Sequence, residues 1–349
     1  MSRIRTLVVG LGQMGQSHAL AYHRNPGFEI AGFVNRTPVA LPGELSGYRM
    51  FPDFDTALAE KPDLVSVNTY TDSHAAYAIA ALESGAHVFV EKPLAQSVAE
   101  AERVVRAARR SGRKLVIGYI LRHHPSYVEF IRRARMLGSP LVMRMNLNQQ
   151  SSGIAWEIHK RLMLSTSPVV DCGVHYIDVM LQICKSPPVQ VRGMGVRLSA
   201  EIAETQVNYG HLQVLFADGS VGWYEAGWGP MISETAFFVK DVIGPHGSVS
   251  IVMDEGAASA SVDTHTKTAR IRVHGAATDR AGNFVKPDEL LSMRDEPAHQ
   301  ELCEREQQYV LEVIRGDLDL EKHMRDAVQS LAVVLAAERS MQEARAVDL

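Results

Sequence analysis

The sequence has few of the features that mark secreted, membrane-spanning or nucleic-acid-binding proteins. Its 349 residues include three cysteines, Cys172, Cys184 and Cys303, which are odd in number and lack the paired spacing of a zinc site. No apolar run approaches the roughly 20 residues that a membrane-spanning helix needs. The net charge of -4 gives no electrostatic reason to bind nucleic acid or an anionic membrane surface. We therefore expect reduced thiols in a cytoplasmic protein that binds neither nucleic acid nor membrane.

The sequence also lacks the patterns of a secretory leader and of a hydrolytic metal site. The chain starts Met-Ser-Arg-Ile-Arg and continues at once into a strand pattern, so we expect no secretory leader. The 14 histidines include no His-Glu-x-x-His pattern, so we expect no hydrolytic metal centre. Hydrophobic residues make up 46% of the chain, which is ordinary for a globular protein of this length with two cores.

The first third of the chain alternates between apolar strand patterns and amphipathic helix patterns. This alternation predicts parallel βαβ units and a doubly wound Rossmann sheet. The expected strands are 4–10, 29–35, 64–68, 88–90 and 115–118, and the expected helices are 13–24, 53–60, 73–84 and 99–111.

The pattern changes after Pro125, where longer strands and tight turns replace the alternation. Strand-like stretches between residues 189 and 273 are broken by Asp218-Gly219 and by Pro245-His246-Gly247, which predicts a large, mostly antiparallel, open sheet. We predict two domains, a Rossmann domain over 1–122 and an α/β domain for substrate and oligomerisation over 123–349. The expected elements besides these strands are helices at 126–136, 171–184, 301–314 and 323–344, the last packing back near the Rossmann domain, and a strand at 141–148.

A glycine motif follows the first expected strand and opens the first expected helix. In Gly10-Leu-Gly12-Gln-Met-Gly15, Gly10 permits a tight turn, Gly12 lets the backbone approach a pyrophosphate, and Gly15 allows close helix packing. The amino terminus of the helix carries partial positive charge that favours phosphate. The motif in this context predicts a dinucleotide site that includes Gln13 and Met14.

The second expected strand ends without the acidic residue that usually binds the adenosine ribose. It ends instead at Asn35-Arg36-Thr37. Arg36 can pair with a 2′-phosphate through its planar guanidinium, which favours NADP. Alternatively, Arg36 stacks on adenine, which is compatible with NAD.

The run His87-Val-Phe-Val-Glu91-Lys92-Pro93 places a lysine directly after an apolar strand. In a doubly wound fold the carboxyl ends of the strands face the ligand, so Lys92 is expected where nicotinamide and substrate meet. Glu91 either anchors the lysine segment or is a solvated carboxylate at the strand end.

A second constellation occurs in the expected helix 171–184. At 100° per residue, Asp171, His175 and Asp178 share one stripe of that helix. An aspartate beside a histidine orients the imidazole and raises its basicity, so the pair can act as a general base. The alternative is that Asp171 caps the helix and His175 is a core histidine.

Together, the glycine motif, Glu91-Lys92-Pro93 and Asp171-x-x-x-His175-x-x-Asp178 resemble the Gfo/Idh/MocA oxidoreductase family over essentially the whole chain. The resemblance implies a Rossmann domain, a second α/β domain with an open sheet often used in oligomers, and a nicotinamide cofactor in an active site between the domains. Two stretches depart from the family pattern: Ser165–Val170 replaces a glycine-rich lead-in, and the second strand lacks its acidic end.

The resemblance also implies the roles of individual residues. Lys92 matches the catalytic lysine, Asp171 the substrate-site aspartate and His175 the catalytic histidine, while Arg122 lies in the stretch that joins the domains. The loop from Thr69 through Tyr70 to His74 matches the segment that lines the cofactor, to which Glu91 and Lys92 are added. Further candidate substrate contacts, chosen because polyols need several fixed donors and acceptors, are His123, His124, Asn146, Gln149, Trp156, Lys160 and Tyr176.

We therefore predict reversible hydride transfer between nicotinamide and a carbinol carbon of a sugar or cyclic polyol. His175 takes the hydroxyl proton and Lys92 stabilises the alkoxide, or Lys92 is itself the proton shuttle. The alternatives are a nucleotide-binding sensor without catalysis and an oxidoreductase for a dihydrodiol, aldehyde or imine. Apolar residues on both alternations of 207–216 and 220–228 predict a homo-oligomer, a dimer or a tetramer.

Overall fold

The computed structural model describes residues 2–233, 238–253, 268–293 and 295–349. Contacts between Cα atoms divide the chain into two compact units: unit 1 is Met1–Ile120 with Pro297–Val328, and unit 2 is Leu121–Glu296 with Gln329–Leu349. The sequence alone indicated a single boundary after residue 122. The chain instead changes unit again at Pro297 and once more within α10 (Glu321–Glu343).

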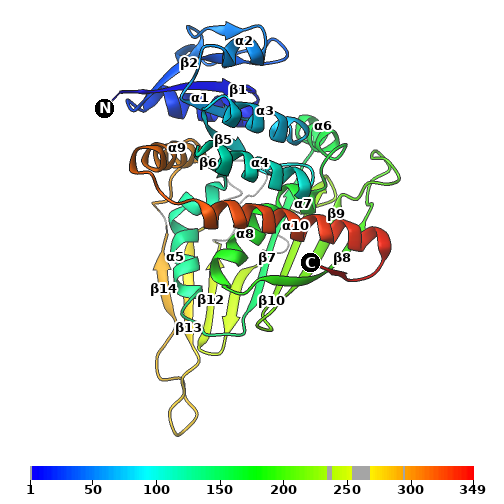
Figure 1. The fold of residues 1–349 in the computed structure, drawn as a ribbon. Helices are drawn as coiled ribbons and strands as arrows, with labels where there is room; N and C mark the ends of the chain where they lie inside the picture. The colour runs from blue at the N-terminus through cyan, green and yellow to red at the C-terminus, as the bar shows by residue number, and fades with distance from the viewer. Residues whose placement is uncertain (1, 234–237, 254–267, 294) are drawn as a thin grey trace. The chain divides into compact units, whose positions relative to one another are not determined.

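Unit 1 is built on a parallel sheet with strand order β3-β2-β1-β4-β5-β6 (Figure 1). The order reverses between β1 and β4, and a doubly wound sheet binds its ligand at such a switch point, beyond the carboxyl ends of the strands. The strands are β1 (Ile4–Val9), β2 (Phe28–Val34), β3 (Met50–Phe51), β4 (Leu64–Val67), β5 (His87–Glu91) and β6 (Leu115–Gly118). The helices are α1 (Gln13–Arg24), α2 (Phe54–Leu58), α3 (Thr71–Glu83), α4 (Val98–Ser111) and α9 (His299–Gly316), with a 3₁₀ turn η1 (Gly43–Leu45).

One apolar core of unit 1 forms where α1 and α9 pack side by side over the sheet. It buries Val8 of β1, Tyr22 of α1, Phe89 of β5 and Leu311 of α9, all at most 5% exposed. Burying large apolar side chains stabilises a fold by about 1.5–3 kcal/mol each. Residues from near the end of the chain therefore complete the core of unit 1.

Unit 2 is built on a sheet with strand order β14-β13-β12-β11-β7-β10-β9-β8-β15. Only β7 and β10 pair in parallel among these described strands, and the other pairs are antiparallel. The strands are β7 (Val142–Gln150), β8 (Pro188–Val196), β9 (Tyr209–Phe216), β10 (Val221–Gly229), β11 (Lys240–Gly244), β12 (Gly247–Val252), β13 (Arg270–Gly275), β14 (Glu289–Ser292) and β15 (Val347–Asp348). The sequence-based prediction of an α/β fold with a parallel Rossmann sheet and a large, mostly antiparallel second sheet is confirmed.

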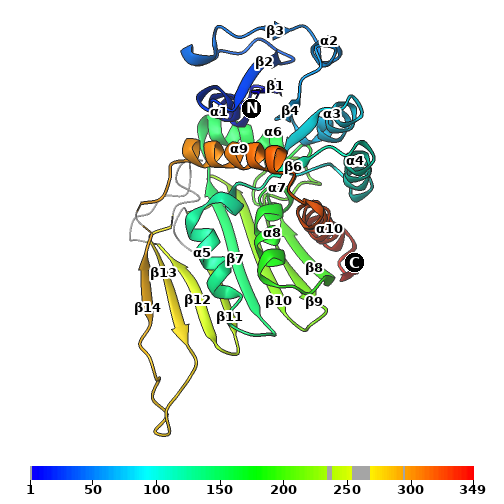
Figure 2. The same cartoon turned by 60° about the vertical axis from the view of Figure 1, so that its left-hand side comes forward.

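The helices of unit 2 pack on one face of this sheet, as Figure 2 shows for α5 and α8. The predicted helix 171–184 is present as a helix that begins at Gly173 and ends at Ile183. Asp171 lies outside it and ends a short preceding helix, which Ser167 caps and Pro168 begins. The helices are α5 (Pro125–Ala134), α6 (Gly153–Leu162), α7 (Pro168–Asp171) and α8 (Gly173–Ile183), and the 3₁₀ turn η2 (Ile120–His123) leads into them. Among the described residues, no helix combines the length and apolar character that crossing a lipid bilayer requires.

Candidate active site

The glycine motif forms the turn from β1 into α1, and each glycine has a separate steric reason. Gly10 has a φ of 85°, and a Cβ there would lie 2.6 Å from the carbonyl oxygen of Asn68. A Cβ on Gly15 would lie 2.0 Å from the carbonyl oxygen of Gly10. A Cβ on Gly12 would meet nothing within 4 Å, so this side of the turn is open. The turn thus fits the close approach of a dinucleotide backbone.

The amino terminus of α1 faces that open side. Gly12 is its N-cap and supplies no side-chain hydrogen bond, so the first amides of the helix, from Gln13 and Met14, are suited to bind an anion. Asn35, at the end of β2, braces the turn: its Oδ1 accepts a hydrogen bond from the amide of Leu11 at 2.9 Å.

Arg36 follows Asn35 and is exposed. Its guanidinium makes no ion pair with any residue that the structure describes. The side chain is therefore available to a phosphate or to an adenine ring, as the sequence indicated.

The loop after β4 brings the next candidate residues to the switch point. Tyr70 is 57% exposed, which suits a ring that covers a ligand. His74 is buried, with Nδ1 2.7 Å from the carbonyl oxygen of Pro93 and Nε2 2.9 Å from that of Thr69. Burial lowers the pKa of His74, and the two carbonyls oppose that effect. Both ring nitrogens of His74 thus face backbone carbonyls, and the neutral ring donates to one of them, so neither nitrogen is directed at a cofactor.

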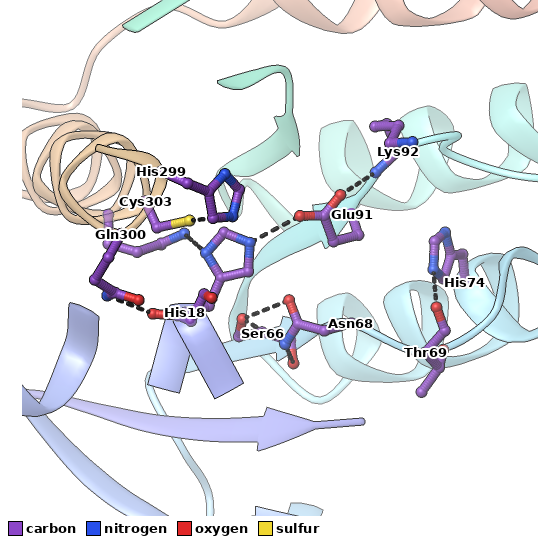
Figure 3. Close-up of polar contacts among 12 residues, drawn as sticks. His18, Ser66, Asn68, Thr69, His74, Glu91, Lys92, His299, Gln300 and Cys303 are labelled. Carbon is purple, nitrogen blue, oxygen red and sulfur yellow. Dashed lines mark hydrogen bonds and ion pairs between the residues drawn. The ribbon is translucent and has the colours of Figure 1, made fainter. Parts of the chain in front are cut away.

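Lys92 follows β5 in the same unit and is half-buried. Its amide donates to Oε2 of Glu91 at 3.0 Å, and the Oε1 atom of Glu91 lies 2.8 Å from Nε2 of His18 (Figure 3). Glu91 is only 7% exposed. It is therefore an anchor of the lysine segment and not a solvated carboxylate at the strand end.

Unit 2 carries the other two candidate catalytic residues on consecutive helices. Asp171 is the last residue of α7, and His175 lies in the first turn of α8; both are half-buried. The thiol of Cys172, between them, lies 3.7 Å from Oδ2 of Asp171 and 3.7 Å from Oε1 of Gln149. Asp171 is thus not an N-terminal cap.

Aromatic and amide groups gather at the carboxyl ends of the parallel strands β7 and β10. Gln149 and Trp228 are register partners there, and the indole of Trp228 donates to Oε1 of Gln149 at 2.8 Å. The ring of His159 stacks on Trp228 with centroids 4.4 Å apart. Burial lowers the pKa of His159 to about 4, and the charge of Asp171 opposes that shift. His159 is therefore neutral at pH 7.

Arg122 does not present its guanidinium to open space. It binds Asp178 with two hydrogen bonds, one of them from Nε to Oδ2 at 2.9 Å. Asp178 is 1% exposed. Asp178 therefore does not act with Asp171 and His175 as one group, because it pairs with Arg122. The guanidinium of Arg122, expected to contact substrate, binds this aspartate instead.

Several other candidate substrate contacts also have partners inside unit 2. Oδ1 of Asn146 accepts from the amide of Val239 at 2.9 Å, and the ring of Tyr176 stacks on Tyr224. Trp156 and Lys160 both donate to Glu201, at 3.2 and 2.8 Å. His124 caps α5, since its Nδ1 accepts a hydrogen bond from the amide of Ser126. Burial lowers the pKa of His123 to about 4.

Sequence reasoning missed three buried polar residues, two of them in unit 1 and one in unit 2. His18 and Gln307 are both fully buried and hydrogen-bonded to each other, although 289 residues separate them. Lys240 is 2% exposed, its ammonium lies 3.8 Å from the ring centroid of Phe238, and burial lowers its pKa to about 7. A lysine at the start of an ordinary strand pattern carries no signal of burial.

Comparisons with known proteins agree with this geometry. Residues 4–119 match the family model described as oxidoreductase family, NAD-binding Rossmann fold, and residues 129–259 match the GFO/IDH/MocA C-terminal domain. The chain is 30% identical over 207 residues to UDP-N-acetylglucosamine 3-dehydrogenase of Acidithiobacillus ferrooxidans, which covers 58% of this chain and 62% of that protein. It is 28% identical over 270 residues to inositol 2-dehydrogenase of Rubrobacter xylanophilus, covering 73% of each.

Solved structures show the same fold. Myo-inositol 2-dehydrogenase of Lactobacillus plantarum superposes with a TM-score of 0.79 at 19% identity, covering 100% of both chains. The two family models together span most of the chain and confirm the resemblance predicted from its motifs. The chain therefore belongs to the Gfo/Idh/MocA oxidoreductase family, with an NAD-binding Rossmann fold at its amino-terminal end.

Proposed function

We propose that the protein is an NAD(P)-dependent oxidoreductase acting on a carbinol carbon of a sugar or cyclic polyol. The observation that carries the proposal is the open turn at Gly12, after β1, in the same unit as Lys92, which follows β5; one strand, β4, separates β1 from β5 in the sheet. The names of the relatives, which include inositol and UDP-N-acetylglucosamine dehydrogenases, support this class of substrate.

The residues divide the work between binding and proton transfer. The amides at the start of α1 hold the pyrophosphate, Tyr70 covers the cofactor, and the bound nicotinamide supplies or accepts the hydride. His175, oriented by Asp171, takes the proton of the substrate hydroxyl. The ammonium of Lys92 hydrogen-bonds the same oxygen and stabilises the alkoxide charge. In the alternative, Lys92 is a neutral amine and takes the hydroxyl proton in place of His175.

A substrate panel tests the proposal. Purified protein is mixed with NAD⁺ or NADP⁺ and each of myo-inositol, scyllo-inositol, glucose and UDP-N-acetylglucosamine, and reduced cofactor is followed at 340 nm. The reverse direction is measured with NAD(P)H and the corresponding ketones, with simple aldehydes and imines alongside. Turnover of a polyol or sugar supports the proposal. Cofactor binding without turnover of any compound indicates a sensor, and turnover of aldehydes or imines alone indicates the other reductase class.

We further propose that Arg36 binds the 2′-phosphate of NADP(H). Arg36→Ala should then weaken NADP(H) binding by about 1.5–3 kcal/mol, the scale of a charge-assisted hydrogen bond. NAD(H) binding should hardly change, because NAD(H) lacks the phosphate. Asn35→Asp should shift the preference toward NAD(H) by repelling the phosphate and offering the ribose a carboxylate. Dissociation constants for both cofactors at fixed salt measure this, and equal losses on removing Arg36 would mean that it stacks on adenine.

The open face of the unit 2 sheet supports a homo-oligomer, a dimer or a tetramer. A hollow of about 580 Å³ lies on this face, and its lining includes Val142, Leu215, Val221 and Trp223. Three of these side chains are 39–41% exposed, and the lining also includes Arg144, Gln190, Arg192 and Gln213. Apolar side chains exposed together and bordered by polar ones often mark an interface between protein chains. Light scattering at micromolar concentration should give a multiple of 38.4 kDa. Val221→Asp should shift the mass toward that of one chain, whereas a wild-type monomer would contradict the proposal.

A further inference from the structure

A buried chain of hydrogen bonds connects the late helix α9 to the backbone of Lys92. Nε2 of Gln307 lies 2.9 Å from Nδ1 of His18, and Nε2 of His18 lies 2.8 Å from Oε1 of Glu91. The other carboxyl oxygen of Glu91 accepts the amide of Lys92 at 3.0 Å (Figure 3). Gln307 and His18 are each 0% exposed. Such bonds are stronger and more directional away from water.

The chain of donors has a defined direction. The amide nitrogen of Gln307 can only donate, so Nδ1 of His18 is the acceptor and the ring proton sits on Nε2. Nε2 therefore donates to Glu91. Gln307 thus sets the tautomer of His18 that holds the carboxylate.

A second buried carboxyl group, that of Glu306, lies on the same helix as Gln307. Glu306, next to Gln307 on α9, is 1% exposed, and neither of its carboxyl oxygens has a hydrogen-bond partner among the described residues. Burial, and then the charge of Glu91, raise the pKa of Glu306 well above its usual range. Glu91 receives two N–H donors, which favour its ionised form. Burial therefore favours the neutral form of Glu306, and His18 is hydrogen-bonded to Glu91.

The dipeptide Lys92-Pro93 is also held through the carbonyl group of Pro93. The carbonyl of Pro93 contacts Nδ1 of His74 at 2.7 Å, and Nε2 of His74 contacts the carbonyl of Thr69 at 2.9 Å. The N–H of Lys92 and the C=O of Pro93 are thus both fixed by buried side chains. Glu91 and His74 therefore both act on the backbone of the segment that carries Lys92.

We propose that Gln307, His18 and Glu91 are positioning residues that fix Lys92 for the reaction. The inference rests on the proposed function, in which Lys92 acts on the substrate oxygen. A misplacement of about 1 Å from a distant substitution can cost up to about 100-fold in rate. Removing Gln307 should therefore lower kcat through Lys92, although Gln307 itself lies on another helix.

A matched pair of glutamines on α9 separates positioning from helix packing. Gln307 and Gln300 each donate one hydrogen bond from α9 to α1, and Gln300 donates to the carbonyl of Ser17 at 3.0 Å, outside the chain that leads to Glu91. Gln307→Met should lower kcat by about 10-fold, with KM and the cofactor dissociation constant within about twofold. Gln300→Met should leave kcat within about twofold. Equal losses of kcat in both variants would overturn the positioning role.

Hydrogen exchange gives a second readout that needs neither substrate nor cofactor. The Lys92 amide should be protected in the wild type and exchange about 10-fold faster in Gln307→Met, because the tautomer of His18 that donates to Glu91 is no longer fixed. Gln300→Met should leave this exchange unchanged. Glu91→Gln keeps the volume but weakens acceptance from two donors, so it should speed exchange of the Lys92 amide even if Gln307→Met does not fold. Unchanged exchange in the folded variants would overturn the proposal.

The two proposals fail in different ways. If Lys92→Ala stays fully active, the proposed function fails and the positioning role fails with it. If Lys92→Ala is inactive but Gln307→Met matches Gln300→Met in kcat and exchange, the positioning role alone is wrong.

Discussion

Lys92→Ala is expected to reduce kcat by about 100-fold or more and to leave the cofactor dissociation constant within about twofold. The loss is the size expected when a group that stabilises an alkoxide or transfers a proton is removed. Cofactor binding should survive, because the anion-binding amides belong to Gln13 and Met14 at the start of α1. Steady-state kinetics with the best substrate of the panel and a fluorescence titration of the cofactor measure the two quantities.

An exposed lysine provides the control. Lys286 lies in unit 2, and Lys286→Ala should keep the wild-type kcat and cofactor affinity. The backbone amide of residue 92 still donates to Glu91 in Lys92→Ala, so the midpoint of thermal unfolding should change little. A fully active Lys92→Ala enzyme would end the catalytic role.

The Rossmann half was predictable because its signals are local. The expected helix 13–24 coincides with α1 (Gln13–Arg24), and each expected strand of this unit is present within two residues of its predicted ends. The steric reasons for Gly10 and Gly15 follow from contacts within a strand–turn–helix unit. Periodicity and turn chemistry operate over such short distances, so sequence patterns capture them.

The second unit was harder to predict for two physical reasons. Helix α6 exposes Ile154 and Ile158 and buries only Trp156, so it lacks the apolar stripe that identifies a helix. The stripe of Asp171, His175 and Asp178 assumed one continuous helix, whereas a proline start and a new helix at Gly173 divide it. In addition, Asp178 forms an ion pair with Arg122, which the spacing of the three residues could not indicate.

Two of the three positioning residues, His18 and Gln307, could not have been predicted from the sequence. His18 lies in the first helix and Gln307 in the ninth, and no local pattern relates them. The fold unites them because α9 returns to unit 1 and packs beside α1. The sequence had left two roles open for Glu91, and its burial beside His18 favours the anchor over the solvated carboxylate.

Arg122→Ala should lower the free energy of unfolding by about 3–5 kcal/mol, the cost of leaving a buried carboxylate without its ion-pair partner. Asp178 is 1% exposed and would retain the hydrogen bond from Nε2 of Gln182 at 3.0 Å, which is neutral and cannot balance the charge. Urea denaturation of the wild type and the variant measures the loss as a shift of the unfolding midpoint.

A double variant shows whether the loss comes from the unpaired charge. Asp178→Asn removes the carboxylate charge that Arg122→Ala leaves unbalanced. The double variant should therefore be more stable than the Arg122→Ala variant. A substrate-binding role makes the opposite prediction: Arg122→Ala would then raise KM by 10-fold or more, as expected for a lost charge-assisted contact, while the unfolding midpoint stayed at the wild-type value. Loss of a bidentate pair with a buried aspartate should lower stability. A raised KM with an unchanged unfolding midpoint would therefore contradict the structural role and indicate that Arg122 binds substrate.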